Sequence, residues 1–338
     1  MSEETARPAW KGMLNWLPGL AFSLLAIWIL SRVVTWDEVV GALGRVEPWR
    51  LAPAITFYFL GMGLRTLAWR TILQRKASVK QVFYALNEGY LLNNIFPLRL
   101  GEFGRAVLLG RSSKMGALPV LSSIVVERSY DLAISAGLLL ATLPLALNMD
   151  WARPVAWGIL ALVVAGLVGL ALAARYRVGL IDALRRRGLD RSKLGSWVLP
   201  KVEALLGGFG ALTDFRLFAV SLGLMVLSWS CAVGENWFIL SGFVPHPPVW
   251  WVVFVLGVTA LGGALPSSSG SVGVLEAAVV TALVVLKVNQ STALAYGIVL
   301  HLIHYALSSV LGMVGLAREG ESLGGIYREL RARRGTSV

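Results

Sequence analysis

The chain has 338 residues and a formal net charge of +12 at pH 7; 56% of its residues are hydrophobic and 15% are charged. Soluble domains carry about 25% charged residues, so this composition excludes an ordinary soluble protein. It predicts an all-α, polytopic integral membrane protein. The longest polar run, 175–201, has 27 residues, too few for a soluble catalytic domain of ordinary size.

Apolar runs long enough to cross a hydrocarbon core of about 30 Å recur along the chain. We predict about six full spans, at the approximate ranges 17–34, 51–73, 117–147, 155–174, 217–240 and 292–317. No small-residue cleavage site follows the first run, so we interpret it as an uncleaved span rather than a signal peptide. The single cysteine, Cys231, cannot form an internal disulfide.

Basic residues gather in some connecting segments and are scarce in others. The positive-inside rule and attraction to anionic lipids explain this pattern, so we expect no nucleic-acid partner. We predict a multi-pass protein of the cell (inner) membrane with both termini in the cytoplasm. Its expected parts are a basic cytoplasmic loop at 175–201, an interfacial helix at 203–212, external loops at 148–153 and 241–248, and a basic cytoplasmic tail at 318–338.

A first break interrupts the apolar pattern at 93–105, which reads NNIFPLRLGEFGR. Pro97 removes an amide donor and restricts the residue before it, so we predict that a helix stops near Phe96. Basic residues flank the stretch on both sides, which favours a hairpin that enters from the cytoplasm and returns to it. The alternative is a soluble loop whose arginines lie on lipid headgroups. The polar side chains of the break are Asn93, Asn94, Arg99, Glu102 and Arg105.

A second break follows the apolar run 249–265, and a further apolar segment ends at Leu286. Its flanks carry little charge, so we predict a second hairpin that enters from outside. Interrupted apolar segments in corresponding positions point to a transporter's substrate site, and helix starts can hold anions. The alternative is that glycine and proline only permit tight packing. The residues of this break are Pro266, Ser267, Ser268, Ser269, Gly270, Ser271 and Gly273, followed by Glu276.

Three ionisable residues, Glu127, Arg128 and Asp131, lie inside one predicted span. Each costs about 2.5–3.5 kcal/mol at the bilayer centre, together about 8–10 kcal/mol, so we expect them to face the protein interior. They form either a structural ion-pair cluster or part of a functional site. One arginine between two carboxylates leaves an excess of acid, which Arg99 or Arg105 could balance.

Other polar residues in the spans are interpreted as interior pairing groups: Arg65, Glu235, Asn236, His301 and His304. His301, His304 and Glu276 could ligate zinc, but no further ligand accompanies them, so we predict no metal site. The second break does not fit GxxxxGK[ST], and its serines lack a G-x-S-x-G setting. We therefore expect neither a cofactor nor a serine nucleophile.

Three ordered motifs resemble those of the lysylphosphatidylglycerol synthase transmembrane family, also called flippase-like. They are N-x-x-x-P-x-R-x-G-E-x-x-R from Asn93 to Arg105, E-R-x-x-D from Glu127 to Asp131, and P-x-x-x-G-x-x-G-x-x-E from Pro266 to Glu276. The third departs from the family pattern, because consecutive glycines are common where this chain has Ser269–Gly270–Ser271.

The resemblance implies a lipid-translocating membrane domain. In the bifunctional multiple peptide resistance factors, such a domain moves aminoacylated phosphatidylglycerol between leaflets, and the synthase activity belongs to a separate soluble domain. We therefore expect one transmembrane flippase-like domain over 1–338, without a soluble synthase domain.

The leading hypothesis is a lipid flippase-like transporter, not an enzyme, for a phospholipid or polyprenyl-linked glycolipid. Its partners would be membrane lipids with an anionic or phosphate-bearing headgroup, and homo-oligomerisation is left open. The alternatives are an integral-membrane lipid-modifying transferase and a non-transporting partner of cell-envelope synthesis. The expected substrate-binding residues are Asn93, Asn94, Pro97, Arg99, Glu102, Arg105, Glu127, Arg128, Asp131, Pro266, Ser267, Ser268, Ser269, Gly270, Gly273 and Glu276.

Overall fold

The fold is taken from a computed structural model that describes residues 35–44, 47–96, 100–147, 152–186, 193–262 and 269–320, with isolated positions between 24 and 32. Within these ranges every regular element is a helix, which confirms the predicted all-α class. In chain order they are α3 (Trp36–Leu43), η2 (Pro48–Arg50), α4 (Leu51–Ile72), α5 (Val79–Ile95), α6 (Gly101–Ser112), α7 (Ala117–Leu147), α8 (Ala152–Arg175), α9 (Arg177–Arg186), α10 (Lys193–Gly208), η4 (Phe209–Leu212), α11 (Phe215–Leu240), α12 (Val249–Gly262), η5 (Ser269–Ser271), α13 (Val274–Val285) and α14 (Gln290–Glu319).

Four of the described helices are long and apolar enough to cross a bilayer: α4, α7, α11 and α14. Their bounds agree with the predicted spans to within a few residues, and α8 coincides with the predicted span 155–174. A polytopic membrane protein is thereby confirmed. The predicted span 17–34 lies outside the described residues except at isolated positions, so the number of spans stays a prediction.

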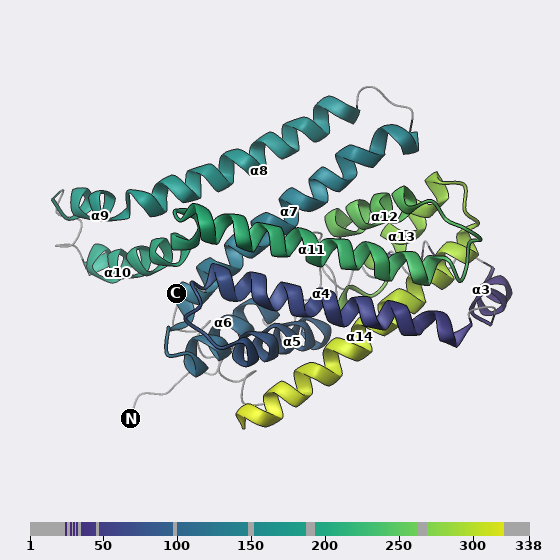
Figure 1. The fold of residues 1–338 in the computed structure, drawn as a ribbon, viewed down its shortest axis with the longest axis horizontal. Helices are drawn as coiled ribbons and strands as arrows, with labels where there is room; N and C mark the ends of the chain where they lie inside the picture. The colour runs from purple at the N-terminus through teal and green to yellow at the C-terminus, as the bar shows by residue number, and fades with distance from the viewer. Residues whose placement is uncertain are drawn as a thin grey trace, which may run out of the picture.

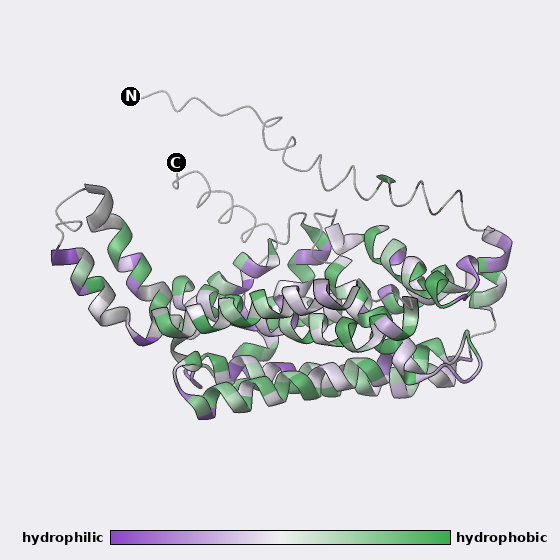
Figure 2. Cartoon of the chain, turned by 90° about the horizontal axis from the view of Figure 1, so that it is seen from above, coloured by the Kyte–Doolittle hydropathy of each residue, from purple (hydrophilic) through white to green (hydrophobic). Residues whose placement is uncertain are grey.

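The long helices run side by side along the longest axis of the molecule (Figure 1). The chain enters and leaves α5 and α6 at the left end in this view, where α9 and α10 also lie, whereas α12 and α13 occupy the right half, toward α3. Figure 2 shows hydrophobic residues along the long helices and hydrophilic segments at both ends. The end-to-end axis is therefore the direction in which we place the membrane normal.

Both predicted hairpins consist of helices too short to cross. The helix α5 has 17 residues, α6 and α13 have 12 each and α12 has 14. At about 1.5 Å per residue, 12 residues span about 18 Å, less than a hydrocarbon core of about 30 Å. The helices of each pair pack against each other, and the pairs enter from opposite ends (Figure 1). Short paired helices at opposite ends of the bundle agree with the predicted hairpins, and their entry into the membrane stays a prediction.

The first break begins where proline chemistry predicts it. The helix α5 ends at Ile95, and Phe96 is extended at φ −103° and ψ 140°, as expected for the residue before a proline. The helix α6 already starts at Gly101, ahead of the apolar run 106–110. A side chain at Gly101 has no room, since its Cβ would lie 1.9 Å from the Gly89 carbonyl oxygen. Glycine therefore permits α6 to approach α5 closely.

The second break depends on left-handed glycines. The helix α12 ends at Gly262, and after 263–268, outside the described residues, Gly270 has φ +68° and Gly273 has φ +82°. Glycine adopts such angles without steric cost. The helix α13 then begins at Val274.

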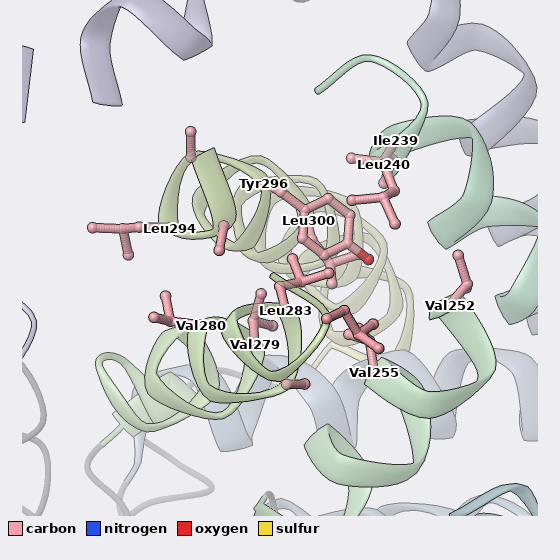
Figure 3. Packing of buried hydrophobic residues seen from close by; sticks show 14 of the residues in the cluster. Ile239, Leu240, Val252, Val255, Val279, Val280, Leu283, Leu294, Tyr296 and Leu300 are labelled. Carbon is pink, nitrogen blue, oxygen red and sulfur yellow. The ribbon is translucent and has the colours of Figure 1, made fainter. Parts of the chain in front are cut away.

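The hydrophobic core has two main parts. One surrounds the second hairpin and joins α11, α12, α13 and α14 (Figure 3); its labelled members are Ile239, Leu240, Val252, Val255, Val279, Val280, Leu283, Leu294, Tyr296 and Leu300. The other joins α4, α5, α6, α7 and α11 around the buried Trp69 and Tyr130. Each hairpin therefore has its own apolar support.

The basic segment 175–201 contains more helix than the sequence indicated. The helix α9 lies within it, and α10 starts at Lys193, ten residues before the predicted start of the interfacial helix 203–212. Apolar residues of α10 explain the difference, since Leu199 and Leu206 are buried. The high charge of the segment concealed this helical pattern.

Candidate functional site

The two breaks lie next to each other beside the middle of α14. A Cβ built on Gly270 would be 3.6 Å from the backbone oxygen of Asn94 and 3.0 Å from the Tyr305 ring. The Tyr305 hydroxyl lies 3.5 Å from the Asn94 backbone oxygen, to which it donates. The Asn94 amide donates to the Ser308 and Ser309 hydroxyls, both at 3.0 Å. Residues far apart in the sequence thus meet within the bundle.

A cavity of about 360 Å³ opens at this meeting point. It borders both hairpins together with α4, α7, α11 and α14. Its size falls in the lower part of the range of ligand pockets, about 300–1,000 Å³. Its charged and polar lining comprises Tyr58, Arg65, Tyr90, Asn93, Asn94, Glu102, Arg128, Ser228, Glu235, Ser271, His301, His304, Tyr305 and Ser308.

One wall of the cavity belongs to a network of six ionisable side chains, here called the arginine cluster: Arg65, Glu102, Arg105, Glu127, Arg128 and Asp131. The Glu127 carboxylate lies at its centre and is fully buried. Its Oε2 is 2.9 Å from Nη1 of Arg105, and its Oε1 is 3.1 Å from Nη2 of Arg128 and 3.6 Å from Nε of Arg65. Three helices are joined through this one carboxylate.

The other two carboxylates complete the arginine cluster. Glu102 lies 2.5 Å from Nη2 of Arg105, and Asp131 lies 3.1 Å from Nη1 of Arg128. Asp131 also pairs with Arg65 and accepts from the Trp229 indole at 3.0 Å. Three guanidinium groups face three carboxylates, so the formal charge of the cluster is zero. The excess acid expected from the sequence is balanced by Arg105 and by Arg65.

The three arginines differ in their access to the cavity. The side chain of Arg105 is 2% exposed and stacks on the Trp69 ring, with Cζ 4.6 Å from the ring centroid. The Arg65 side chain is 14% exposed and that of Arg128 is 33% exposed. The buried arginines hold the carboxylates in place. The cluster can therefore present Arg128 to an anion without carrying net charge itself.

Two histidine–carboxylate pairs that share α14 also lie at the cavity, which His301, His304 and Glu235 line. Nδ1 of His301 is 2.5 Å from Oε1 of Glu276, whose Oε2 accepts the Gly273 N–H at 2.7 Å. Nε2 of His304 is 2.7 Å from Oε1 of Glu235 on α11. Each histidine contacts a different carboxylate, and the described residues contain no group of three metal ligands.

Several expected site residues line the cavity: Asn93, Asn94, Glu102, Arg128 and Gly270. Arg105, Glu127 and Asp131 stand behind this layer in the arginine cluster, and Gly273 is held by Glu276. Ser269 lies in η5 but does not line the cavity. The predicted residues Pro97, Arg99, Pro266, Ser267 and Ser268 lie outside the described residues.

The substrate-binding prediction omitted Arg65, Glu235, His301 and His304, which all line the cavity. The sequence did contain a signal for these four residues, because an ionisable residue inside a span is costly and usually faces the bundle interior. What the sequence lacked was the rotation of each helix. That rotation decides which polar groups share one space.

Comparison with known proteins agrees with the motifs. Residues 16–312 match the family described as lysylphosphatidylglycerol synthase TM region. The chain is also similar to a protein named glycosyltransferase AglD from Haloferax volcanii, at 26% identity over 350 aligned positions that cover 91% of this chain and 55% of AglD. It thus spans little more than half the length of that relative. Because the family match extends over most of the sequence, this chain belongs to the lysylphosphatidylglycerol synthase transmembrane-region family.

Proposed function

We propose that the chain is a flippase-like transporter that moves a phospholipid or a polyprenyl-linked glycolipid across the cell membrane. The family and the glycosyltransferase-named relative support a role in handling lipids or glycolipids. The observation that carries the transport proposal is the shared cavity, which both hairpins reach from opposite ends of the bundle. Interrupted helices that meet at a midplane cavity suit alternating access.

The headgroup phosphate would bind at Arg128. Its side chain is the most exposed of the three arginines in the cluster, and guanidinium N–H donors suit phosphate. The phosphate would share these donors with Glu102, Glu127 and Asp131, which already contact Arg128. Arg105 and Arg65 would support it indirectly, by holding Glu127 and Asp131. Because the charges of the cluster cancel, Arg128 does not leave an unpaired charge in the bilayer when no anion is bound.

Polar groups of both breaks would bind the rest of the headgroup. Asn93 and Ser271 line the cavity among the described residues. On sequence grounds we extend the proposed site to Pro97, Arg99, Pro266, Ser267 and Ser268. The acyl or prenyl chains would stay in the bilayer, against the exposed apolar side chains of the outer helices.

A lipid-modifying transferase is the second candidate, and the name of the relative AglD favours it. This chain corresponds to about half of that protein, so the named activity need not lie in the shared half. The carboxylates around the cavity would then act as bases. A transferase yields a chemically new lipid, whereas a flippase moves a lipid without altering it.

The test is leaflet exchange in phosphatidylcholine vesicles that contain the purified protein and NBD-labelled phosphatidylglycerol. Dithionite bleaches the label in the outer leaflet, so the time course reports movement. We expect faster exchange with the wild type than in empty vesicles. Loss of a charged hydrogen bond worth about 1.5–3 kcal/mol should slow Arg128→Gln by roughly tenfold or more.

Arg185→Gln is the matched control, because Arg185 lies on α9, away from the cavity, with a side chain that is 49% exposed and pairs with Glu203. It should exchange lipid at the wild-type rate. Equal rates for a folded Arg128→Gln and the wild type would contradict the assigned site. A new lipid species in the extract, without exchange, would support the transferase instead.

A further inference from the structure

The histidine–carboxylate pairs differ from the arginine cluster in their charge. With neutral imidazoles, the pairs Glu235–His304 and Glu276–His301 each carry one negative charge, whereas the formal charges of the arginine cluster cancel. The arginine cluster and the two pairs, taken together, therefore carry a negative net charge. An anionic headgroup that enters the cavity meets this negative charge unless the pairs bind protons.

The four side chains of the two pairs differ in how much of their surface is exposed. The His304 side chain is 47% exposed and lines the cavity, whereas the side chain of its partner Glu235 is 3% exposed. The His301 and Glu276 side chains are 14% and 10% exposed. A proton from cavity water can reach an imidazole nitrogen and be shared with the carboxylate behind it. The edge of the Tyr58 ring against His304, at 5.3 Å between centroids, keeps that imidazole in place.

From these contacts we propose that the two histidine–carboxylate pairs form a proton-binding site coupled to the anionic headgroup, so that lipid and protons move together. This inference rests on the proposed function and adds its driving ion. Each pair gains one proton and passes from a net charge of −1 to zero, and no bond other than N–H or O–H forms or breaks. Because coupling between two ligands is reciprocal, bound headgroup favours proton uptake and bound protons favour the headgroup.

The structure offers a route from proton binding to movement. One oxygen of Glu276 contacts His301, while the other accepts the N–H of Gly273, the residue directly before α13. A proton on this pair weakens the carboxylate as an acceptor for Gly273. The second break, which contacts the first at Gly270, is thereby released. Charge at the cavity wall is thus connected to the hairpin that we expect to move.

Other ionisable groups face the pairs from the neighbouring helices. The arginines among them are already matched with carboxylates, and free tyrosine and cysteine side chains lose protons only above neutral pH. Histidine is the side chain that exchanges protons near neutrality. The facing groups are Tyr58, Arg65, Tyr90, Glu102, Arg128 and Tyr305, with Cys231 one turn before Glu235.

The experiment imposes a pH gradient on the vesicles described above and measures the steady distribution of NBD-labelled phosphatidylglycerol between leaflets. Each proton that moves with a lipid should shift the distribution about tenfold per pH unit, toward the more alkaline side, so the wild type with both pairs should shift it about a hundredfold. His304→Gln keeps an amide at the position of Nε2 but cannot take up a proton, so only the His301–Glu276 pair can still respond. We expect this variant to move lipid with a response reduced to about tenfold per pH unit.

The chain provides its own control, because the third of its three histidines, His246, lies on an exposed loop. His246→Asn should respond to the gradient like the wild type, and asparagine tolerates the φ of +49° found there. Lipid exchange with no response to the gradient in the wild type would overturn the proton proposal and leave the flippase proposal standing. No lipid exchange in any preparation would overturn the flippase proposal itself, and the proton proposal with it.

Proton uptake gives a second readout that does not depend on transport. Lyso-phosphatidylglycerol is added to the detergent-purified chain in weakly buffered solution with a pH dye. Uptake should reach up to two protons per chain in the wild type, one for each pair, and about half of that in His301→Asn. If His304→Gln does not fold, Glu235→Gln replaces it. Equal uptake by the wild type and a folded double variant of His301 and His304 would contradict the site.

Discussion

The two hairpins hold an amide at the start of their returning helix in different ways. In the first hairpin, Asn93 at the end of α5 accepts the N–H of Gly101, the first residue of α6, across the break at 2.8 Å. In the second, Glu276 within α13 accepts the N–H of Gly273, the residue directly before α13, at 2.7 Å. Helix starts leave amides without intrahelical partners, and inside a membrane these need an acceptor from the protein.

This difference separates a fixed hairpin from an adjustable one. The Asn93 side chain is neutral and links α5 to α6, and the Arg105–Glu127 contact then ties α6 to α7. Glu276 makes no such link to α12 through this contact, and its second oxygen contacts His301. We therefore expect the first hairpin to act as a rigid wall of the cavity and the second to move.

The largest expected effect comes from the carboxylate that anchors the fixed hairpin. In Glu127→Gln, three buried or half-buried arginines face only two carboxylates. Removal of one partner from a buried ion pair costs about 3–5 kcal/mol. We expect a loss of that size in the free energy of unfolding, measured by SDS titration in mixed micelles.

Glu276→Gln is the matched comparison in the second hairpin. Its amide oxygen still accepts the Gly273 N–H, so the loss should be limited to about 1–2 kcal/mol, as for a single weakened hydrogen bond. Equal losses for the two variants would contradict the division into a fixed and an adjustable hairpin.

The next effect concerns the close approach of α5 and α6. In Gly101→Ala the new Cβ would lie 1.9 Å from the Gly89 carbonyl oxygen and 2.6 Å from Oδ1 of Asn93. The Gly89 carbonyl belongs to the backbone and cannot move aside as a flexible side chain can. We therefore expect a loss of about 3 kcal/mol in the free energy of unfolding. Thermal unfolding followed by size-exclusion chromatography measures it. Gly223→Ala on α11, where nothing lies within 4 Å, should be neutral or stabilising.

The helices could be predicted because their signals are local. Hydropathy and length located α4, α7, α11 and α14, and Pro97 located the end of α5. The opposed hairpins followed from the charge of their flanking segments. In α10, by contrast, charged residues concealed an apolar face that includes Leu199 and Leu206.

The site was predicted less completely because its contacts are not local. Arg65 pairs with Asp131 across 66 positions, and His304 meets Glu235 across 69. Hydropathy gives the position of a span but not which of its faces meets which neighbour. The sequence motifs identified the residues around the two breaks. The helices α4, α11 and α14, which carry no such motif, supplied the rest of the cavity.

A smaller effect tests the link across the first break. Asn93→Ala leaves the Gly101 amide without its acceptor, and a buried unsatisfied group costs about 1–3 kcal/mol. Asn93→Asp keeps an acceptor oxygen and should recover part of that loss in the same unfolding measurement. If alanine and aspartate proved equally destabilising, the Asn93–Gly101 bond would not be what holds the returning helix.

The smallest expected effect comes from alanine substitutions that distinguish backbone strain from a steric contact at the second break. Gly270 and Gly320 share a φ of +68°, but a Cβ on Gly270 would lie 3.0 Å from the Tyr305 ring, whereas one on Gly320 meets nothing within 4 Å. Alanine at either position should cost about 1–2 kcal/mol of stability for its left-handed backbone. Only Gly270→Ala should also slow lipid exchange, because it presses on the residue that joins the two breaks. If Gly320→Ala slowed exchange equally, movement would depend on general stability and not on this contact.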